Sequence, residues 1–221
     1  MFPYGKLYYH RKRRLAIKLI EPLNSIFDQF SKLKVLRLLT RTDAELSGRE
    51  IAKAVGISHV ICNRSLQELS RHGLIRMRKA GRSILYSLNK DHILVKDFLT
   101  PLFLKENRLF SLLKKLLLEK LSEPKPLSIV LFGSQIKKER ARPDSDFDIM
   151  FILPNDIDLK KFKREIAQSE AKIERIFGNR AALLIMKKNE FLKRRDKGDS
   201  LLLSVEKENK LIFGKHLREI K

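Results

Sequence analysis

The chain has 221 residues, with 48 Lys and Arg against 26 Asp and Glu, which gives a formal net charge of +22. Hydrophobic residues make up 43%, which suffices for ordinary cores and excludes a wholly disordered chain. The longest uncharged run, Pro126 to Ile136, is far shorter than the roughly 20 apolar residues that span a bilayer. The basic N-terminus lacks the apolar region of a signal peptide, and the single Cys62 excludes an internal disulfide. We therefore expect a cytoplasmic location and no membrane partner.

Positive charge is concentrated in the first half of the chain. Residues 1–100 hold 20 Lys and Arg against 8 Asp and Glu. Excess positive charge binds phosphate by releasing counterions, so nucleic acid is the partner class that this composition favours. The alternative is that these side chains only solvate the surface, and composition alone does not decide between the two.

The patterning changes at Asp91 and again between Pro124 and Pro126, which divides the chain. The predicted segments are a basic N-terminal arm over 1–24, three helices and a two-stranded ribbon over 25–90, a helical linker over 91–125, and a strand-helix alternation over 126–221. The linker is expected to break near Pro101. Its broad apolar face favours packing between domains or dimerisation, so a homodimer is one expectation.

Two capped helices stand in the middle of the first domain. Ser47 followed by Glu50 is a capping-box pattern, and the short helix that it starts ends at Gly56. Ser58 caps a second helix, which Gly73 ends. The sequence therefore predicts two consecutive helices joined by a tight turn.

The second helix has one apolar face and one polar face. Its core face carries Cys62, Leu66 and Leu69. Its outward face carries the side chains suited to reading base edges, namely His59, Asn63, Arg64 and Gln67. Two short strands follow, and their hairpin carries cations suited to phosphate or the minor groove, namely Arg76, Arg78, Lys79 and Arg82.

The segment 46–89 resembles the winged helix-turn-helix domains of prokaryotic transcriptional regulators. The resemblance implies DNA binding, with the second helix in the major groove and the hairpin as the wing. Winged helices also serve as protein-protein modules, which is the alternative for this domain.

A second motif carries chemistry. The predicted strand 128–132 ends in Gly133 and Ser134, and Asp146 and Asp148 follow on a later strand. Alternate strand residues share a face, so the two carboxylates project together and repel each other unless a cation lies between them. Oxygen ligands of this kind favour Mg²⁺ shared with substrate phosphates, while the glycine permits close backbone approach and the serine adds donors to phosphate oxygens. The motif predicts a metal-nucleotide site.

The stretch 129–153 resembles the signature of the polymerase-beta-like nucleotidyltransferase superfamily, closest to its minimal prokaryotic members. The resemblance implies an α+β chain whose C-terminal mixed sheet is flanked by helices, and transfer of NMP from an NTP to an unidentified hydroxyl acceptor. It implies Gly133 and Ser134 as the phosphate turn, and Asp146 and Asp148 as catalytic ligands of Mg²⁺ or Mn²⁺. The following loop carries cations that suit a triphosphate, namely Lys137, Lys138, Arg140 and Arg142.

The chain departs from the family pattern in two places. The family carries a third carboxylate on a later strand, where this sequence has Ala182 or a neighbour, with Glu190 and Glu174 as substitute candidates. The loop after the Gly-Ser turn has Lys137 and Lys138 where the family has a basic residue followed by glycine. Two hypotheses stay open: an enzyme with a DNA-binding winged helix, or a transcriptional regulator with a catalytically degenerate nucleotidyltransferase domain. The family also implies a helical partner protein, as in toxin-antitoxin pairs.

Overall fold

The computed structural model describes residues 20–137 and 142–221. It divides into two compact units, Met1–Asn107 (unit 1) and Arg108–Lys221 (unit 2), each with its own hydrophobic core. Residues 1–19 of the predicted basic arm, and Lys138 and Arg140, lie outside the described residues. Within the described ranges, no helix is long and apolar enough to cross a membrane.

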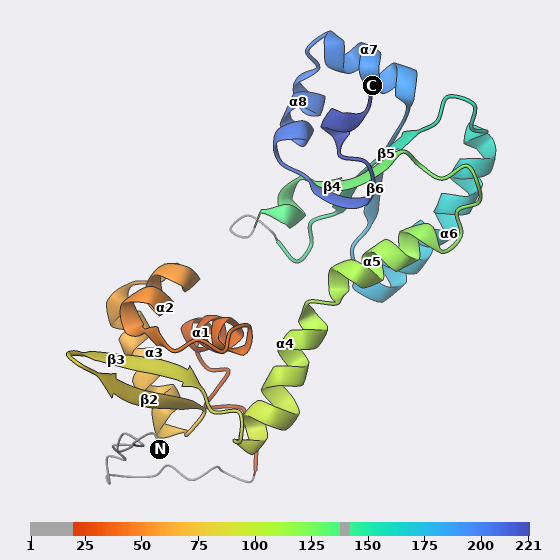
Figure 1. Cartoon of the computed structure of the whole chain (residues 1–221). Helices are drawn as coiled ribbons and strands as arrows, with labels where there is room; N and C mark the ends of the chain where they lie inside the picture. The colour runs from red at the N-terminus through yellow and green to blue at the C-terminus, as the bar shows by residue number, and fades with distance from the viewer. Residues whose placement is uncertain (1–19, 138–141) are drawn as a thin grey trace, which may run out of the picture. The chain divides into compact units, whose positions relative to one another are not determined.

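Unit 1 combines helices with a small antiparallel sheet (Figure 1). Its elements are α1 (Phe30–Thr40), β1 (Leu46–Ser47), α2 (Gly48–Val55), α3 (His59–Arg71), β2 (Ile75–Ala80), β3 (Ser83–Leu88), the π-helix η1 (Leu94–Leu99) and α4 (Thr100–Glu106). The strand order is β1-β3-β2. The three helices and the β2–β3 hairpin predicted from the sequence are confirmed, whereas the two-residue strand β1 was not predicted.

The predicted helix boundaries of the first domain are confirmed by their caps. Ser47 and Glu50 form the reciprocal capping box at the start of α2, and Gly56 ends that helix in the left-handed region with φ +63. The Ser58 hydroxyl accepts a hydrogen bond from the Ile61 N–H at the start of α3. The chain between α2 and α3 is therefore fixed by local hydrogen bonds at both ends.

A buried ammonium joins α3 to α1. Lys32 is 1% exposed, and its Nζ lies 2.6 Å from a Glu68 carboxylate oxygen and 2.9 Å from a carboxylate oxygen of Asp28. Burial opposes the charge, but hydrogen bonds to Glu68 and Asp28 outweigh it and raise the pKa of Lys32 above its usual value. Because Glu68 lies on α3, this ion pair fixes the helix that carries the predicted DNA-reading face.

The helical segment after the hairpin is interrupted at a different place from the predicted one. The sequence predicts a break near Pro101. The helix type does change there, because the π-helix η1 ends at Leu99 and α4 begins at Thr100, but the helical path continues through the proline. The chain instead widens into η1 before this proline and turns at Asn107 and Arg108. The segment 91–125 is thus divided between the two units.

Unit 2 is built on a mixed sheet. Its elements are α5 (Leu109–Leu118), β4 (Ser128–Phe132), the 3-10 helix η2 (Ser134–Ile136), β5 (Phe147–Leu153), α6 (Leu159–Phe177), β6 (Ala181–Lys187), α7 (Lys188–Asp196), α8 (Ser200–Lys207), β7 (Lys210–Gly214) and the 3-10 helix η3 (Leu217–Glu219). The predicted alternation of strands and helices is confirmed, and the predicted strand 128–132 is β4. Helix α8 was not predicted; Asp199 caps it by accepting the N–H groups of Leu201 and Leu202.

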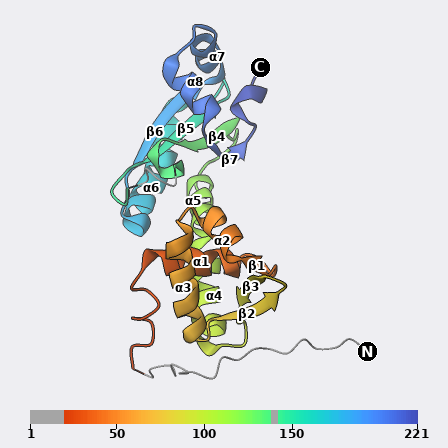
Figure 2. The ribbon, with the colours of Figure 1, turned by 90° about the vertical axis from the view of Figure 1, so that its left-hand side faces the viewer.

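The unit 2 sheet has the strand order β6-β5-β4-β7, with β4 antiparallel to β5 and β5 parallel to β6. Helices α5 and α6 cover one face, and α7 and α8 cover the other (Figures 1 and 2). Alternate residues of β5 enter the two cores, as the period of a strand requires. The start of β5 lies beside the end of β4, at one end of these two central strands.

We predict that Lys32→Met lowers the free energy of unfolding by about 2 kcal/mol or more, because Glu68 and Asp28 lose their shared cation while the side-chain volume is kept. Lys53→Met, at an exposed site on α2, is the matched control, with an expected change within about 0.5 kcal/mol. Urea denaturation followed by circular dichroism measures both. Equal losses for the two variants would contradict a stabilising role of the buried ion pair.

Candidate functional site

The Gly-Ser turn and the Asp-x-Asp pair meet at one end of the two central strands of the unit 2 sheet. Phe132, the last residue of β4, is the register partner of Asp148 on β5. Gly133 follows with φ +76, a conformation that favours glycine, and a Cβ at this position would lie 2.0 Å from Asp148 Oδ2. The carboxylate therefore lies against the glycine backbone, and this turn needs glycine for both conformation and space.

The two carboxylates of the pair influence each other. Asp146 is exposed just before β5, and Asp148 is half-buried. Burial, and then the negative charge of Asp146, raise the pKa of Asp148 above its usual value. A divalent cation between two oxygen donors offsets both of these costs. The donor set therefore fits Mg²⁺ or Mn²⁺.

The loop that carries Asp146 is held by two side-chain amides. Gln135 and Asn179 each donate a hydrogen bond to the carbonyl oxygen of Ser145 at 2.9 Å. Asn179 also donates to the carbonyl oxygen of Pro143 at 2.6 Å. Neither residue is predicted from the sequence, because both bind backbone atoms of the loop and such contacts leave no sequence motif.

Ala182, on β6, lies next to the Asp146 and Asp148 pair. It is the register partner of Asp148. It lies on the same face of β6 as Met186, which belongs to the core beneath α7 and α8. Among the described residues, no third His, Cys, Asp or Glu joins Asp146 and Asp148. Glu190 follows the far end of β6, and Glu174 lies on α6 over the opposite face of the sheet. Neither glutamate joins the pair.

Lys137 lies just beyond the turn and is held by an acid. Its Nζ is 3.0 Å from an oxygen of Glu208, which follows α8. Ser134 opens η2 directly after Gly133. Arg142 is exposed, and the remaining predicted cations of this loop lie outside the described residues. The turn thus has one described lysine beside it, and this lysine is ion-paired.

In unit 1, α3 presents the face that the sequence predicts. His59, Arg64 and Gln67 are exposed, and Asn63 is half-buried with its amide 3.3 Å from the His59 ring. Arg64 is 75% exposed at its side chain and lies 3.4 Å from a Glu68 oxygen. The core face is as predicted too, because Cys62 and its apolar neighbours are fully buried.

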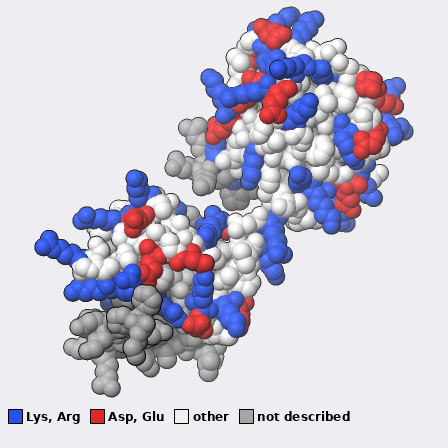
Figure 3. All heavy atoms as spheres, in the orientation of Figure 1, with Lys and Arg blue, Asp and Glu red and all other residues white. Residues whose placement is uncertain are grey.

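The hairpin cations differ in their freedom to meet a ligand. Arg76 is ion-paired with Asp91, and Arg78 with Glu45. Lys79 and Arg82 flank the hairpin tip, are exposed, and form no ion pair within the described part of the chain. Figure 3 shows Lys and Arg side chains at the end of unit 1 that carries this tip. The tip, rather than the strand bodies, offers unpaired positive charge.

Comparison with known families agrees with this division of the chain. A family model described as polymerase beta, nucleotidyltransferase matches residues 114–217, and one described as winged helix-turn-helix DNA-binding matches residues 31–76. The chain is a winged helix-turn-helix domain followed by a polymerase beta nucleotidyltransferase domain. No curated protein matches the sequence.

Solved structures similar to parts of the chain include a winged helix-turn-helix domain, the protein HlyU and a toxin-antitoxin protein. The homodimeric winged helix-turn-helix DNA-binding domain Mb0332 from Mycobacterium bovis is 22% identical, with a TM-score of 0.33, over 39% of this chain and 77% of that one. Reduced HlyU from Vibrio cholerae is 24% identical, with a TM-score of 0.32, over 39% and 82%. A mutant of the toxin-antitoxin MntA-HpeT is 18% identical, with a TM-score of 0.35, over 50% and 77%.

The nucleotidyltransferase domain brings together four of the residues that the sequence predicts for its site. These four residues lie at one end of the central strands, and they are Gly133, Ser134, Asp146 and Asp148. Nucleotidyltransferases of this family generally use divalent metals and NTP, which matches the chemistry of these groups. Ala182 is the departure, because it places a methyl group beside Asp148.

We predict that Gly133→Ala destabilises the nucleotidyltransferase domain and displaces Asp148, because the added Cβ meets the carboxylate and the φ disfavours alanine. Gly198→Ala is the matched control: Gly198 has φ +75, with nothing within 4 Å of its added Cβ. The control should lose about 1 kcal/mol, and Gly133→Ala at least twice as much. Thermal denaturation measures both, and equal losses would contradict the close contact.

Proposed function

We propose that the protein is a Mg²⁺-dependent nucleotidyltransferase that transfers NMP from an NTP to a hydroxyl acceptor, with release of pyrophosphate. Its winged helix binds DNA and brings the enzyme to its place of action. The observation that carries the proposal is the Asp148 carboxylate against Gly133, with Asp146 beside it, in a domain of this family. Both activities agree with the cytoplasmic location expected from the sequence.

Each residue of the site has a role in this proposal. The Gly133 backbone and the Ser134 hydroxyl bind NTP phosphates. Asp146 and Asp148 hold the metal ion, which, when bound, neutralises phosphate charge and lowers the pKa of the acceptor hydroxyl. Lys137 exchanges Glu208 for a phosphate oxygen. Because Ala182 supplies no oxygen, metal affinity is low and turnover is slow.

We predict that Mg²⁺-dependent pyrophosphate release falls about 100-fold or more in Asp148→Asn, because a neutral amide is a poor cation ligand. Asp144→Asn makes the same charge change in the neighbouring loop and is expected to retain turnover. Ala182→Asp is expected to raise turnover, because the new carboxylate lies in register with Asp148. The assay uses each NTP labelled at the γ-phosphate, which leaves in the released pyrophosphate.

Two outcomes of this assay decide against the enzyme. Turnover that persists in Asp148→Asn would contradict the assigned site. Absence of turnover in the unmodified chain with every NTP, together with its appearance in Ala182→Asp, would support the second candidate: a DNA-binding transcriptional regulator with a degenerate nucleotidyltransferase domain. The alanine beside Asp148 is the observation that favours this alternative.

The proposed DNA interface combines α3 with the hairpin tip. Arg64, Gln67 and His59 present donors and acceptors to base edges, and Lys79 and Arg82 present positive charge to phosphate. Arg76 and Arg78 contribute less in this proposal, because DNA must compete with Asp91 and Glu45 for them. Asn63 positions His59 through the contact between their side chains.

We predict that Arg64→Ala weakens binding to a duplex selected from a random pool by about 1–3 kcal/mol and relaxes base preference at one position. Arg82→Ala should instead weaken all duplexes alike and lower the salt slope by about 1. Lys160→Ala, exposed on α6 of the other unit, is the charge control. Fluorescence anisotropy at several salt concentrations measures them, and a uniform loss in all three variants would contradict a defined interface.

The homodimer and the helical partner expected from the sequence stay predictions. Phe98 and Leu102, on the helical segment of unit 1, are about half-exposed, at 52% and 50%, which favours self-association.

A further inference from the structure

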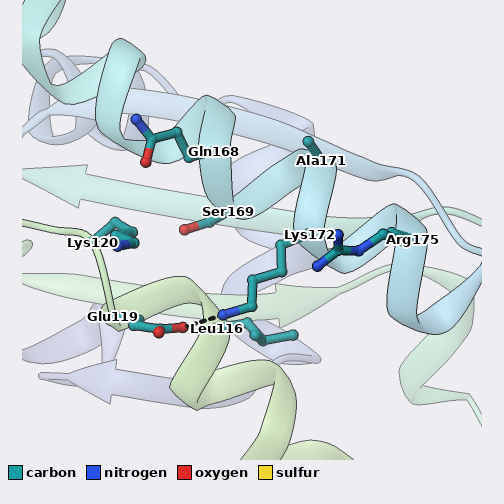
Figure 4. A pocket seen from close by; sticks show the side chains of 8 residues that line it. All are labelled: Leu116, Glu119, Lys120, Gln168, Ser169, Ala171, Lys172 and Arg175. Atoms are coloured by element: carbon teal, nitrogen blue, oxygen red, sulfur yellow. Dashed lines mark hydrogen bonds and ion pairs between the residues drawn. The ribbon is translucent and has the colours of Figure 1, made fainter.

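A groove lies between α5 and α6, over the sheet face opposite to that of Asp148 (Figure 4). Its volume is about 380 Å³, within the size range of small-molecule sites. Its lining residues come from α5, from the chain directly after it and from α6. None of them belongs to the nucleotide site described above.

Two polar contacts join the chain after α5 to α6 at this groove, and one of them crosses it (Figure 4). The Ser122 hydroxyl donates to Glu165 at 2.7 Å, and Lys172 Nζ lies 2.7 Å from a Glu119 oxygen. Ser169 lies between Glu165 and Lys172 along α6. These contacts hold the chain after α5 against α6 at positions on either side of Ser169.

Ser169 is the buried polar group of the groove. It is 1% exposed, and its hydroxyl has no hydrogen-bond partner. Figure 4 shows this hydroxyl directed into the space between the two helices. A buried hydroxyl without a partner is costly, and an acceptor bound in the groove removes that cost.

The charges of the lining favour an anion. Lys120, Lys172 and Arg175 face one acid, Glu119, which pairs with Lys172. Lys120 and Arg175 form no ion pair within residues 20–137 and 142–221. Arg175 lies one turn beyond Ala171 on the same side of α6, so its guanidinium is available at the rim of the groove.

We propose that this groove binds the phosphate group of a small organic phosphate, with the apolar part of the ligand on Leu116 and Ala171. Arg175 and Lys120 pair with the phosphate, and the Ser169 hydroxyl donates to one of its oxygens. This site needs no metal ion and does not depend on the proposed transfer reaction.

The test is a titration of the full chain with phenyl phosphate in the presence of EDTA, which keeps the nucleotide site metal-free. Calorimetry gives the affinity, and amide resonances of Ser169 and Lys172 locate the ligand. Arg175→Gln should weaken binding about tenfold or more, and Ser169→Ala by several-fold. Ser169→Ala should not lower thermal stability, because its hydroxyl has no partner in the free protein.

Lys163→Gln is the matched control, an exposed cation on α6 that does not line the groove. It should leave the affinity within about twofold, since it changes only the net charge. An equal loss in Lys163→Gln and Arg175→Gln would overturn the proposal and indicate nonspecific attraction to a basic protein. Absence of a saturable shift at Ser169 would overturn it as well.

Discussion

The contact between the Asp148 carboxylate and the Gly133 backbone is the constraint on which the candidate site depends. The contact exists because Phe132, the last residue of β4, pairs with Asp148 on β5. The chain leaves β4 at the next residue, Gly133, and so passes directly over the Asp148 carboxylate. Any side chain at this turn would occupy the space of the Asp148 oxygen. The same contact brings the turn proposed to bind phosphate beside the two acids proposed to hold the metal ion, where the central strands meet both hydrophobic cores.

The winged helix-turn-helix domain is organised by a different interaction. The ammonium of Lys32 is buried and joins α1 to α3 through Glu68, which also lies near Arg64. A recognition helix must present its side chains in a fixed orientation, because base edges are read by directional hydrogen bonds. We infer that the ion pair fixes the orientation of α3 relative to α1 in addition to contributing to stability.

Local patterns predicted most of the fold, because their causes are local. The capping box of Ser47 follows from hydrogen bonds between residues three apart, and the strand that carries Asp148 follows from the period of a strand. Asp146, predicted to lie on the same strand, stands one residue before it. What the sequence did not predict depends on tertiary contacts, such as the anchoring of the Asp146 loop by Gln135 and Asn179. The pairing of Arg78 with Glu45 is of the same kind, since it joins residues from separate elements.

The central claim is that Asp146 and Asp148 form a working metal-nucleotide site despite the alanine on the neighbouring strand. Calorimetric titration of each NTP, with Mg²⁺ and with EDTA, tests it without knowledge of the acceptor. The account predicts binding by the unmodified chain that needs Mg²⁺ and disappears when both aspartates are changed to asparagine. Mg²⁺-independent binding that survives this double change, or no NTP binding at all, would contradict it.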